Sequence, residues 1–194
     1  MANERSITRE GRIRDLEKDL IETMSVSKVS DIPELPFNSL KDVKTALKNK
    51  KLQIAVEYDA DNMEYYSTRS QYFIHSTLIF TPYIFMILST TVAILTKQWV
   101  ILIGIPLAFL GQLSSSPYFK IRGTVSGLGG MILVITLFLG WQWVIISGSL
   151  FFPLFFTMIA REQYTHLMND IAFRSEIIFC YFVLKKYIRI RVKR

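Results

Sequence analysis

The stretch that decides the fold is QYFIHSTLIFTPYIFMILSTTVAILT at residues 71–96, which contains no Asp, Glu, Lys or Arg. Two more uncharged stretches follow at residues 98–119 and 123–160. The hydrocarbon core of a bilayer is roughly 30 Å thick and an α-helix rises about 1.5 Å per residue, so roughly 20 apolar residues are enough to cross it. The three stretches therefore predict an integral membrane protein.

The third stretch is too long to be a single membrane helix. As one helix, residues 123–160 would extend about 57 Å, nearly twice the thickness of the hydrocarbon core. A break at Gly140–Trp143 divides the stretch, because tryptophan favours the membrane interface. The short connections at residues 96–98 and 140–142 then force two antiparallel hairpins. The four transmembrane helices are expected at about residues 72–95, 99–113, 125–139 and 143–160.

The basic residues around these stretches predict the orientation, because Lys and Arg concentrate on the cytoplasmic side of membrane proteins. With four spans, 22 of the 23 Lys and Arg residues fall on one side and only Lys97 falls on the other. Arg69, the loop with Lys120 and Arg122, and the basic C-terminal tail all agree. We therefore expect a multi-pass protein of the plasma (inner) membrane with its N- and C-termini in the cytoplasm.

The predicted fold class is an all-α membrane protein with a small, mainly helical cytoplasmic module formed by both termini. Residues 1–70 hold 12 Lys and Arg against 13 Asp and Glu and contain a proline-bearing linker at residues 31–38. Residues 71–160 form the transmembrane domain. Residues 161–194 hold 8 basic residues against 3 acidic ones, so the net positive charge is a tail beside the membrane rather than a surface for specific nucleic-acid binding.

Two helices are expected in the N-terminal segment. Within residues 1–24, apolar side chains recur at spacings of three and four, which is typical of an amphipathic helix. These side chains are Ile13, Leu16, Leu20 and Met24. Ser39 followed by Asp42 indicates a second, capped helix start.

The remaining cytoplasmic stretches have mixed patterns. Residues 52–58 alternate between apolar and polar, which indicates a short strand or a continued helix. Residues 58–71 are expected to form a helix that leads directly into the first span. Residues 162–184 are expected to continue the last span as a helix, buried against residues 1–70 or lying at the membrane surface. Residues 187–194 alternate basic with apolar, as in a strand or a basic helix.

Two sets of residues are candidates for contacts in or near the membrane. Small residues let membrane helices approach closely, within one chain or between subunits. The candidates for such packing are Gly123, Ser126, Gly127, Gly129, Gly130 and Gly148. Basic side chains beside a membrane attract anionic lipid headgroups. The candidates for headgroup binding are Lys185, Lys186, Arg189, Arg191, Lys193 and Arg194.

The sequence contains few residues or motifs that indicate catalysis, transport or metal binding. No Asp, Glu, Lys or Arg lies within the predicted spans, where His75 is the only group that titrates near neutral pH, which argues against a proton-coupled transporter. Cys180 is the only cysteine, which excludes an intrachain disulfide and a cysteine-based zinc site. Arg161 and His166 have the Arg-x4-His spacing that resembles the catalytic pair of HEPN ribonucleases, but Arg161 is also placed to anchor the end of the last span. We predict no cofactor, no metal and no established catalytic residue.

Three functions are compatible with this layout. The first is a membrane interaction or scaffold protein that presents its cytoplasmic module to a protein partner and self-associates as a homo-oligomer. The second is an oligomeric pore or membrane-perturbing effector controlled by that module, a layout that looks like that of bacterial antiviral membrane effectors, although no motif assigns the chain to a family. The third is a membrane-bound enzyme with a site at the cytoplasmic face. Because the module is patterned for burial and lacks catalytic motifs, the first function is the leading expectation.

Overall fold

The chain is mostly helical and folds as two compact units. The computed structural model describes residues 8–33, 35–114 and 122–192. Unit 1 consists of Met1–Tyr72 together with Gln163–Arg194, and unit 2 consists of Phe73–Glu162. Unit 1 thus combines the two ends of the chain, and unit 2 is its apolar middle.

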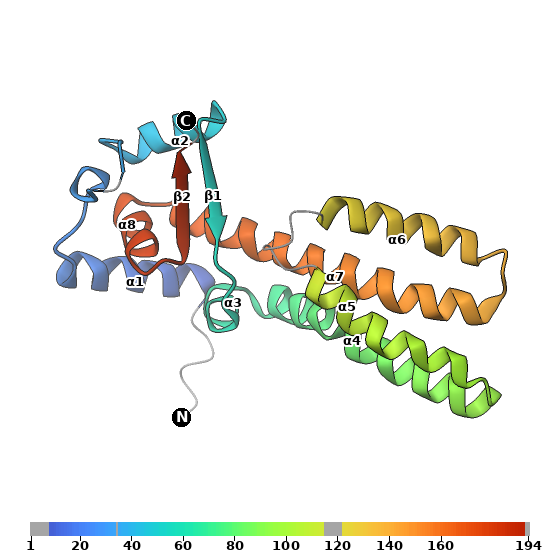
Figure 1. The fold of residues 1–194 in the computed structure, drawn as a ribbon. Helices are drawn as coiled ribbons and strands as arrows, with labels where there is room; N and C mark the ends of the chain where they lie inside the picture. Colours follow the sequence, from blue (N-terminus) through green and yellow to red (C-terminus); the bar gives the residue numbers. More distant parts are fainter. Residues whose placement is uncertain (1–7, 34, 115–121, 193–194) are drawn as a thin grey trace, which may run out of the picture. The chain divides into compact units, whose positions relative to one another are not determined.

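Unit 2 is built from apolar helices (Figure 1). Two of its helices, α4 and α7, are long and apolar enough to cross a membrane. The turn after α4 contains Lys97 with a φ of 57°, and Gly140 before α7 has a φ of 118°, a value that suits glycine because it has no side chain. The elements are α4 (Arg69–Thr96), η3 (Trp99–Ile103), α5 (Gly104–Ser114), α6 (Arg122–Thr136) and α7 (Trp141–Ala172).

The surface of unit 2 is unlike that of a soluble protein. Within the most apolar 18 residues of each long helix, only 22% of α4 and 44% of α7 is buried, whereas the core helix of a soluble protein would be mostly buried. Large apolar side chains are exposed on several elements, including Ile87 at 68%, Leu95 at 77% and Phe138 at 87%. Contiguous apolar surface of this kind is rarely left in contact with water. The helices of unit 2 are therefore suited to a membrane.

Among the residues that the structure describes, unit 1 contains four complete α-helices, one short 3-10 helix, two strands and parts of α4 and α7. Those belonging wholly to it are α1 (Arg9–Thr23), η2 (Val29–Asp31), α2 (Leu40–Lys48), β1 (Leu52–Val56), α3 (Ala60–Tyr66), α8 (Glu176–Leu184) and β2 (Ile188–Val192). The last residues of α7, from Gln163 to Ala172, also belong to unit 1.

The two strands form an antiparallel ribbon that joins the ends of the chain (Figure 1). Leu52 pairs with Val192, and Val56 pairs with Ile188. Because side chains alternate along a strand, Ile188 lies on the buried face, while Arg189 lies on the exposed one. The strand alternatives for residues 52–58 and 187–194 are confirmed over Leu52–Val56 and Ile188–Val192, and residues 193–194 lie outside the described residues.

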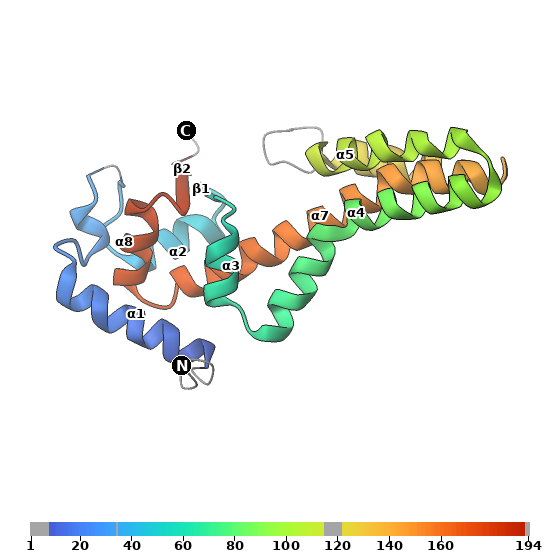
Figure 2. The same ribbon diagram turned by 90° about the horizontal axis from the view of Figure 1, so that it is seen from below.

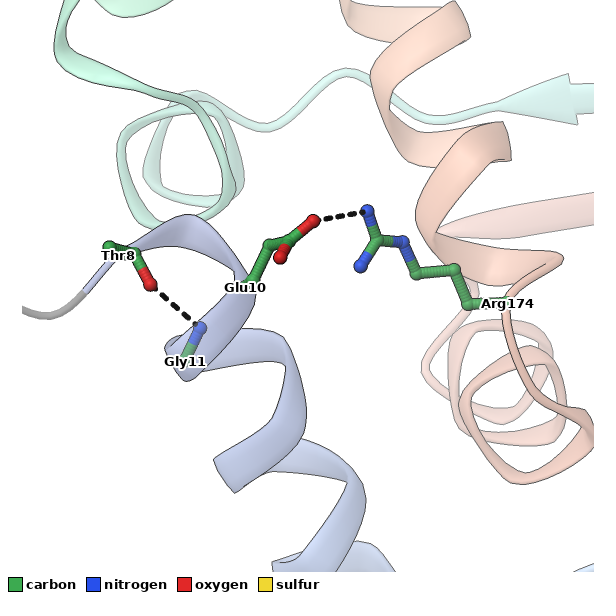
Figure 3. A network of polar contacts seen from close by, with 4 residues as sticks. All are labelled: Thr8, Glu10, Gly11 and Arg174. Carbon is green, nitrogen blue, oxygen red and sulfur yellow. Dashed lines mark hydrogen bonds and ion pairs between the residues drawn. The ribbon is translucent and has the colours of Figure 1, made fainter.

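Polar caps define where the helices of unit 1 begin. The Thr8 hydroxyl accepts a hydrogen bond from the Gly11 amide at 3.3 Å and so caps α1, as Figure 3 shows. In the same view, Glu10 lies 3.8 Å from Arg174, which follows α7. Ser39 accepts from the Asp42 amide at 3.3 Å, which confirms the predicted capped start of α2. These caps satisfy amides that the helices cannot pair internally.

Helix α8 is central to the core of unit 1 (Figure 2). It contacts α1, η2 and β2. Glu176, at its start, accepts a hydrogen bond from the Val29 amide at 2.8 Å, which ties η2 to α8. Its fully buried side chains include Phe179 and Phe182. The expectation that this segment is buried against the N-terminal segment is therefore confirmed.

Three expectations need correction. The chain is mostly helical but not all-α, because unit 1 contains the β1–β2 ribbon. Residues 58–71 do not form one helix leading into α4. Instead α3 ends at Tyr66, and Ser67 adopts an extended backbone before α4 begins. Residues 162–184 are not one helix either, because α7 ends at Ala172 and the Ser175 hydroxyl accepts from the Ile178 amide to start α8 separately.

Candidate functional site

The interior of unit 2 is a seam of small and hydroxyl-bearing residues. Ser89 on α4 lies 3.2 Å from Ser149 on α7, hydroxyl to hydroxyl, and both are buried. Gly104, at the start of α5, lies against this pair. A Cβ atom added to Gly104 would be 2.6 Å from the Ser89 Oγ and 2.7 Å from the Ser149 Oγ. Three helices therefore meet at a point that only glycine can occupy without displacing these hydroxyls.

Helix α5 also lies close to the backbone of α7 at Gly111. A Cβ atom there would lie 2.5 Å from the backbone oxygen of Leu150 and 3.3 Å from the backbone nitrogen of Leu154. The obstacle is the backbone of a helix, which cannot rotate away as a side chain can. Gly111 is therefore required for the two helices to pack at this distance.

A second polar contact joins α6 to α7. Thr136 lies 2.8 Å from Ser147, hydroxyl to hydroxyl, and both side chains are buried. The hydroxyls of Thr90 and Thr96 instead donate to carbonyls of α4 itself. These hydroxyls are thus satisfied inside unit 2, as apolar surroundings require.

The predicted packing residues have different surroundings. The Cβ positions of Gly129 and Gly130 would each lie 3.4 Å from the Phe151 side chain, and that of Gly148 would lie 3.4 Å from Phe152. These three glycines therefore contact α7 side chains within the chain. Gly127 has no atom within 4 Å of its Cβ position. The surroundings of two further candidates, Gly123 and Ser126, lie outside the described part of the chain.

Unit 1 carries an open, polar groove at one end of the ribbon. The groove has a volume of about 500 Å³. It is lined by residues 57–60, which follow β1, and by residues 185–187, which connect α8 to β2, together with Arg189. The Glu57 amide donates to the Tyr187 carbonyl at 2.9 Å and extends the pairing of the ribbon to the groove.

Both carboxylates of the groove already have partners. Glu57 Oε2 accepts a hydrogen bond from a guanidinium nitrogen of Arg189 at 2.6 Å. Asp59 caps α3, because its Oδ1 accepts from the Asp61 amide at 3.0 Å and its Oδ2 accepts from Asn62 Nδ2 at 3.2 Å. The acidic side chains are therefore used to hold the walls of the groove.

The two lysines of the groove, in contrast, carry charge without an acidic partner. Lys185 and Lys186 are both exposed, and neither forms an ion pair with any residue that the structure describes. Lys185 caps the end of α8, and Lys186 has a left-handed backbone with a φ of 62°, which turns the chain into β2. The connection thus contributes two consecutive lysines to the lining of the groove.

Tyrosines contribute the aromatic part of the groove. The Tyr58 ring packs edge-on against Tyr164 with ring centroids 5.0 Å apart, and Tyr187 packs edge-on against Phe182 at 5.8 Å. Burial raises the pKa of Tyr187 above its ordinary value. Its phenol, like that of any ordinary tyrosine, is protonated at neutral pH and can donate a hydrogen bond.

The predicted headgroup residues are not all equivalent. Arg189 is paired with Glu57, whereas Arg191 lies on the exposed face of β2, opposite Gln53. Lys185 and Lys186 line the groove, as does Arg189. Two further candidates, Lys193 and Arg194, lie outside the described residues.

Arg161 and His166 both lie on α7. Arg161 is half-buried and His166 is exposed. Five residues along an α-helix correspond to a rotation of about 140°, so the two side chains leave the helix in different directions. No group of three or more His, Cys, Asp or Glu residues is placed to hold a metal in the part of the chain that the structure describes. The geometry therefore adds no support to a catalytic role for this pair.

Sequence reasoning noted Ser89 and Ser149 as small or hydroxyl-bearing residues of two spans, but it missed Gly104 and Gly111, and it did not predict that Ser89 meets Ser149. Ser89 lies seven residues before Thr96, and Gly104 lies seven residues after Lys97, so the two are placed symmetrically about the turn. This symmetry was a usable signal for their contact in a hairpin.

No protein family, curated protein or solved structure matches the chain.

Proposed function

We propose that this chain is a multi-pass membrane scaffold that displays unit 1 on the cytoplasmic side. The observation that carries the proposal is the exposed apolar surface of unit 2. Side chains such as Ile87, Leu95 and Phe138 face outward, whereas Ser89 and Ser149 face inward. A soluble protein has the reverse arrangement, and lipid is the solvent that favours this one.

Four spans, arranged as two hairpins, extend this proposal. The shorter apolar helices, Trp99–Gly111 and Gly127–Thr136, would accompany α4 and α7 across the membrane. An even number of spans keeps both parts of unit 1 on the same side, which the pairing of β1 with β2 requires. The excess of Lys and Arg on that side supports placing unit 1 in the cytoplasm, with the spans in the plasma (inner) membrane.

The orientation is tested with reporters fused at two positions. Green fluorescent protein after Arg194 should fluoresce, because it folds in the cytoplasm. Alkaline phosphatase after Lys97 should be active, because it needs the oxidising side of the membrane. An active phosphatase after Arg194 would place the C-terminus outside the cytoplasm and refute the proposed orientation.

The scaffold function includes self-association and a cytoplasmic protein partner. The open surroundings of Gly127 support an approach by a second copy, since small residues favour contact between membrane helices. Anionic headgroups would bind the basic tail, to which Arg191 contributes an exposed side chain. Unit 1, with its polar surface and packed core, would provide the face for the partner.

Engineered cysteines test self-association. In a Cys180→Ala background, Gly127→Cys should form disulfide-linked dimers in native membranes. Gly130→Cys is the matched control, since its Cβ position lies 3.4 Å from Phe151 of the same chain, and it should crosslink far less. Monomers from both variants would refute self-association through this face of α6.

Conductance separates the scaffold from the pore. Purified protein reconstituted in liposomes should stay electrically silent, because residues 71–96 and 141–160 contain no Asp, Glu, Lys or Arg and the hydroxyls of Ser89 and Ser149 are buried against each other. Reproducible single-channel currents would instead establish the pore function.

A further inference from the structure

The groove of unit 1 has the composition of a site for an anion. Its carboxylates are occupied, Glu57 by Arg189 and Asp59 by the start of α3. Lys185 and Lys186 also line the groove, and neither forms an ion pair with an acidic residue in the part of the chain that the structure describes. Two lysines that line one groove favour a dianion over a single carboxylate, because a dianion can neutralise both of their charges.

We infer that this groove binds a phosphate monoester. The dianionic phosphate would lie between Lys185 and Lys186 and accept a hydrogen bond from the Tyr187 hydroxyl. The volume of about 500 Å³ also admits the group attached to the phosphate, since sites for small ligands span about 300–1,000 Å³. The Tyr58 ring lies on the wall of the groove, where it can contact an apolar or aromatic part of that group.

Arg189 provides a further contact that depends on Glu57. Their ion pair is exposed, with side-chain exposures of 55% for Arg189 and 47% for Glu57. Exposed ion pairs contribute little to stability, so an incoming phosphate can compete with the Glu57 carboxylate for the guanidinium. The carboxylate therefore weakens phosphate binding, and its removal should strengthen it.

The proposed phosphate site lies in unit 1 alone. Its existence does not depend on the number of spans in unit 2 or on self-association. The same phosphate chemistry is available from a soluble monoester and from the headgroup of phosphatidic acid, so the experiment includes both sources.

Binding is measured by isothermal titration calorimetry on the full-length protein in uncharged detergent micelles. Three probes are titrated separately: inorganic phosphate, adenosine monophosphate and short-chain phosphatidic acid. Short-chain phosphatidylcholine is the control lipid, because its phosphate is a diester with one negative charge masked by choline. Saturable binding of at least one monoester probe is expected, with no binding of phosphatidylcholine.

The chain offers a matched control for the two lysines. Lys50 and Lys51 are also adjacent, exposed lysines, and Lys50 also has a left-handed backbone, with a φ of 56°. They precede Leu52, whose partner is Val192, and so lie at the opposite end of the ribbon from the groove. Replacing either pair by glutamine removes the same charge from the same unit.

The variants have opposite expected effects. Lys185→Gln with Lys186→Gln should weaken binding at least about tenfold, whereas Lys50→Gln with Lys51→Gln should change it less than about twofold. Glu57→Gln should strengthen binding, because Arg189 then becomes available. All three changes lie on the exposed surface, so circular dichroism should show an unchanged fold.

The outcomes distinguish the sources and decide the inference. Binding of the soluble probes supports a soluble ligand, and binding of phosphatidic acid alone supports a lipid headgroup. Absence of saturable binding for all three monoesters up to about 10 mM would overturn the inference. Equal losses from the two lysine pairs would overturn it too, because general electrostatic attraction would then explain the binding.

Discussion

Replacing Gly111 by alanine should destabilise unit 2 through a single steric contact. The added Cβ would lie 2.5 Å from the Leu150 backbone oxygen, whereas carbon–oxygen contacts of this kind prefer about 3.3–3.6 Å. Helices α5 and α7 must therefore separate by roughly 0.8 Å at this point. Because backbone atoms meet on the α7 side, a rotamer change cannot relieve the clash. Overpacking of this kind costs about 1–3 kcal/mol.

A control variant removes the contribution of helix propensity. Alanine is a better helix residue than glycine by up to about 1 kcal/mol, which partly offsets the clash. Gly130→Ala has the same propensity gain, but its Cβ would meet only the Phe151 ring, at an ordinary 3.4 Å. The difference between the two variants, about 1–3 kcal/mol, thus isolates the steric cost at Gly111.

The unfolding free energy is measured in mixed micelles by titration with sodium dodecyl sulfate, followed by tryptophan fluorescence. The three tryptophans are Trp99, Trp141 and Trp143, all in unit 2, so the signal reports on that unit. Gly111→Ala should unfold at a lower detergent fraction than Gly130→Ala. Equal midpoints, or a more stable Gly111→Ala, would refute the close packing of α5 on α7.

Three further predictions concern unit 1. Ser175→Ala removes the cap of α8 and should lower the free energy of unfolding by about 1 kcal/mol, measured by urea denaturation with circular dichroism; an unchanged midpoint would contradict the separate start of that helix. Phe179→Ala empties a fully buried site and should cost about 3–5 kcal/mol, whereas Leu184→Ala, at a position 49% exposed, should cost far less; limited proteolysis should then cleave unit 1 in the first variant only. Burial raises the pKa of Cys180 to about 11, so maleimide should label the folded protein much more slowly than the urea-unfolded protein at pH 7, and similar rates would show that the thiol is accessible. Because the folded thiol holds its proton more tightly than the unfolded one, this group should also make the fold less stable as the pH rises from about 9 towards 11.

The sequence predicts elements better than it predicts their partners. Alternation at residues 52–58 and 187–194 indicated two strands, but alternation defines a buried face and not which strand lies beside it. The Ser39 cap was recognisable because Asp42 follows at the expected spacing. The break before α8 carries a similar signal at Ser175, yet the apolar periodicity on both sides concealed it.

The groove was beyond prediction for a related reason. Charge alone marked Lys185 and Lys186 as candidates for phosphate-bearing headgroups. That these lysines line the same groove as Glu57 depends on the ribbon, in which the Glu57 amide donates a hydrogen bond to the Tyr187 carbonyl. A contact between residues so far apart in the sequence leaves no local sequence pattern. The same holds for Gly111, whose importance arises only from its distance to α7.

The pairing of β1 with β2 also has a consequence for the order of synthesis. Glu57 and Arg189 are 132 residues apart, and the whole of unit 2 lies between them. A ribosome therefore releases β1 long before its partner strand exists. Until then β1 is an unpaired edge, open to pairing with other chains. The folding of unit 1 is therefore completed only after the last strand has been synthesised, when β2 can pair with β1.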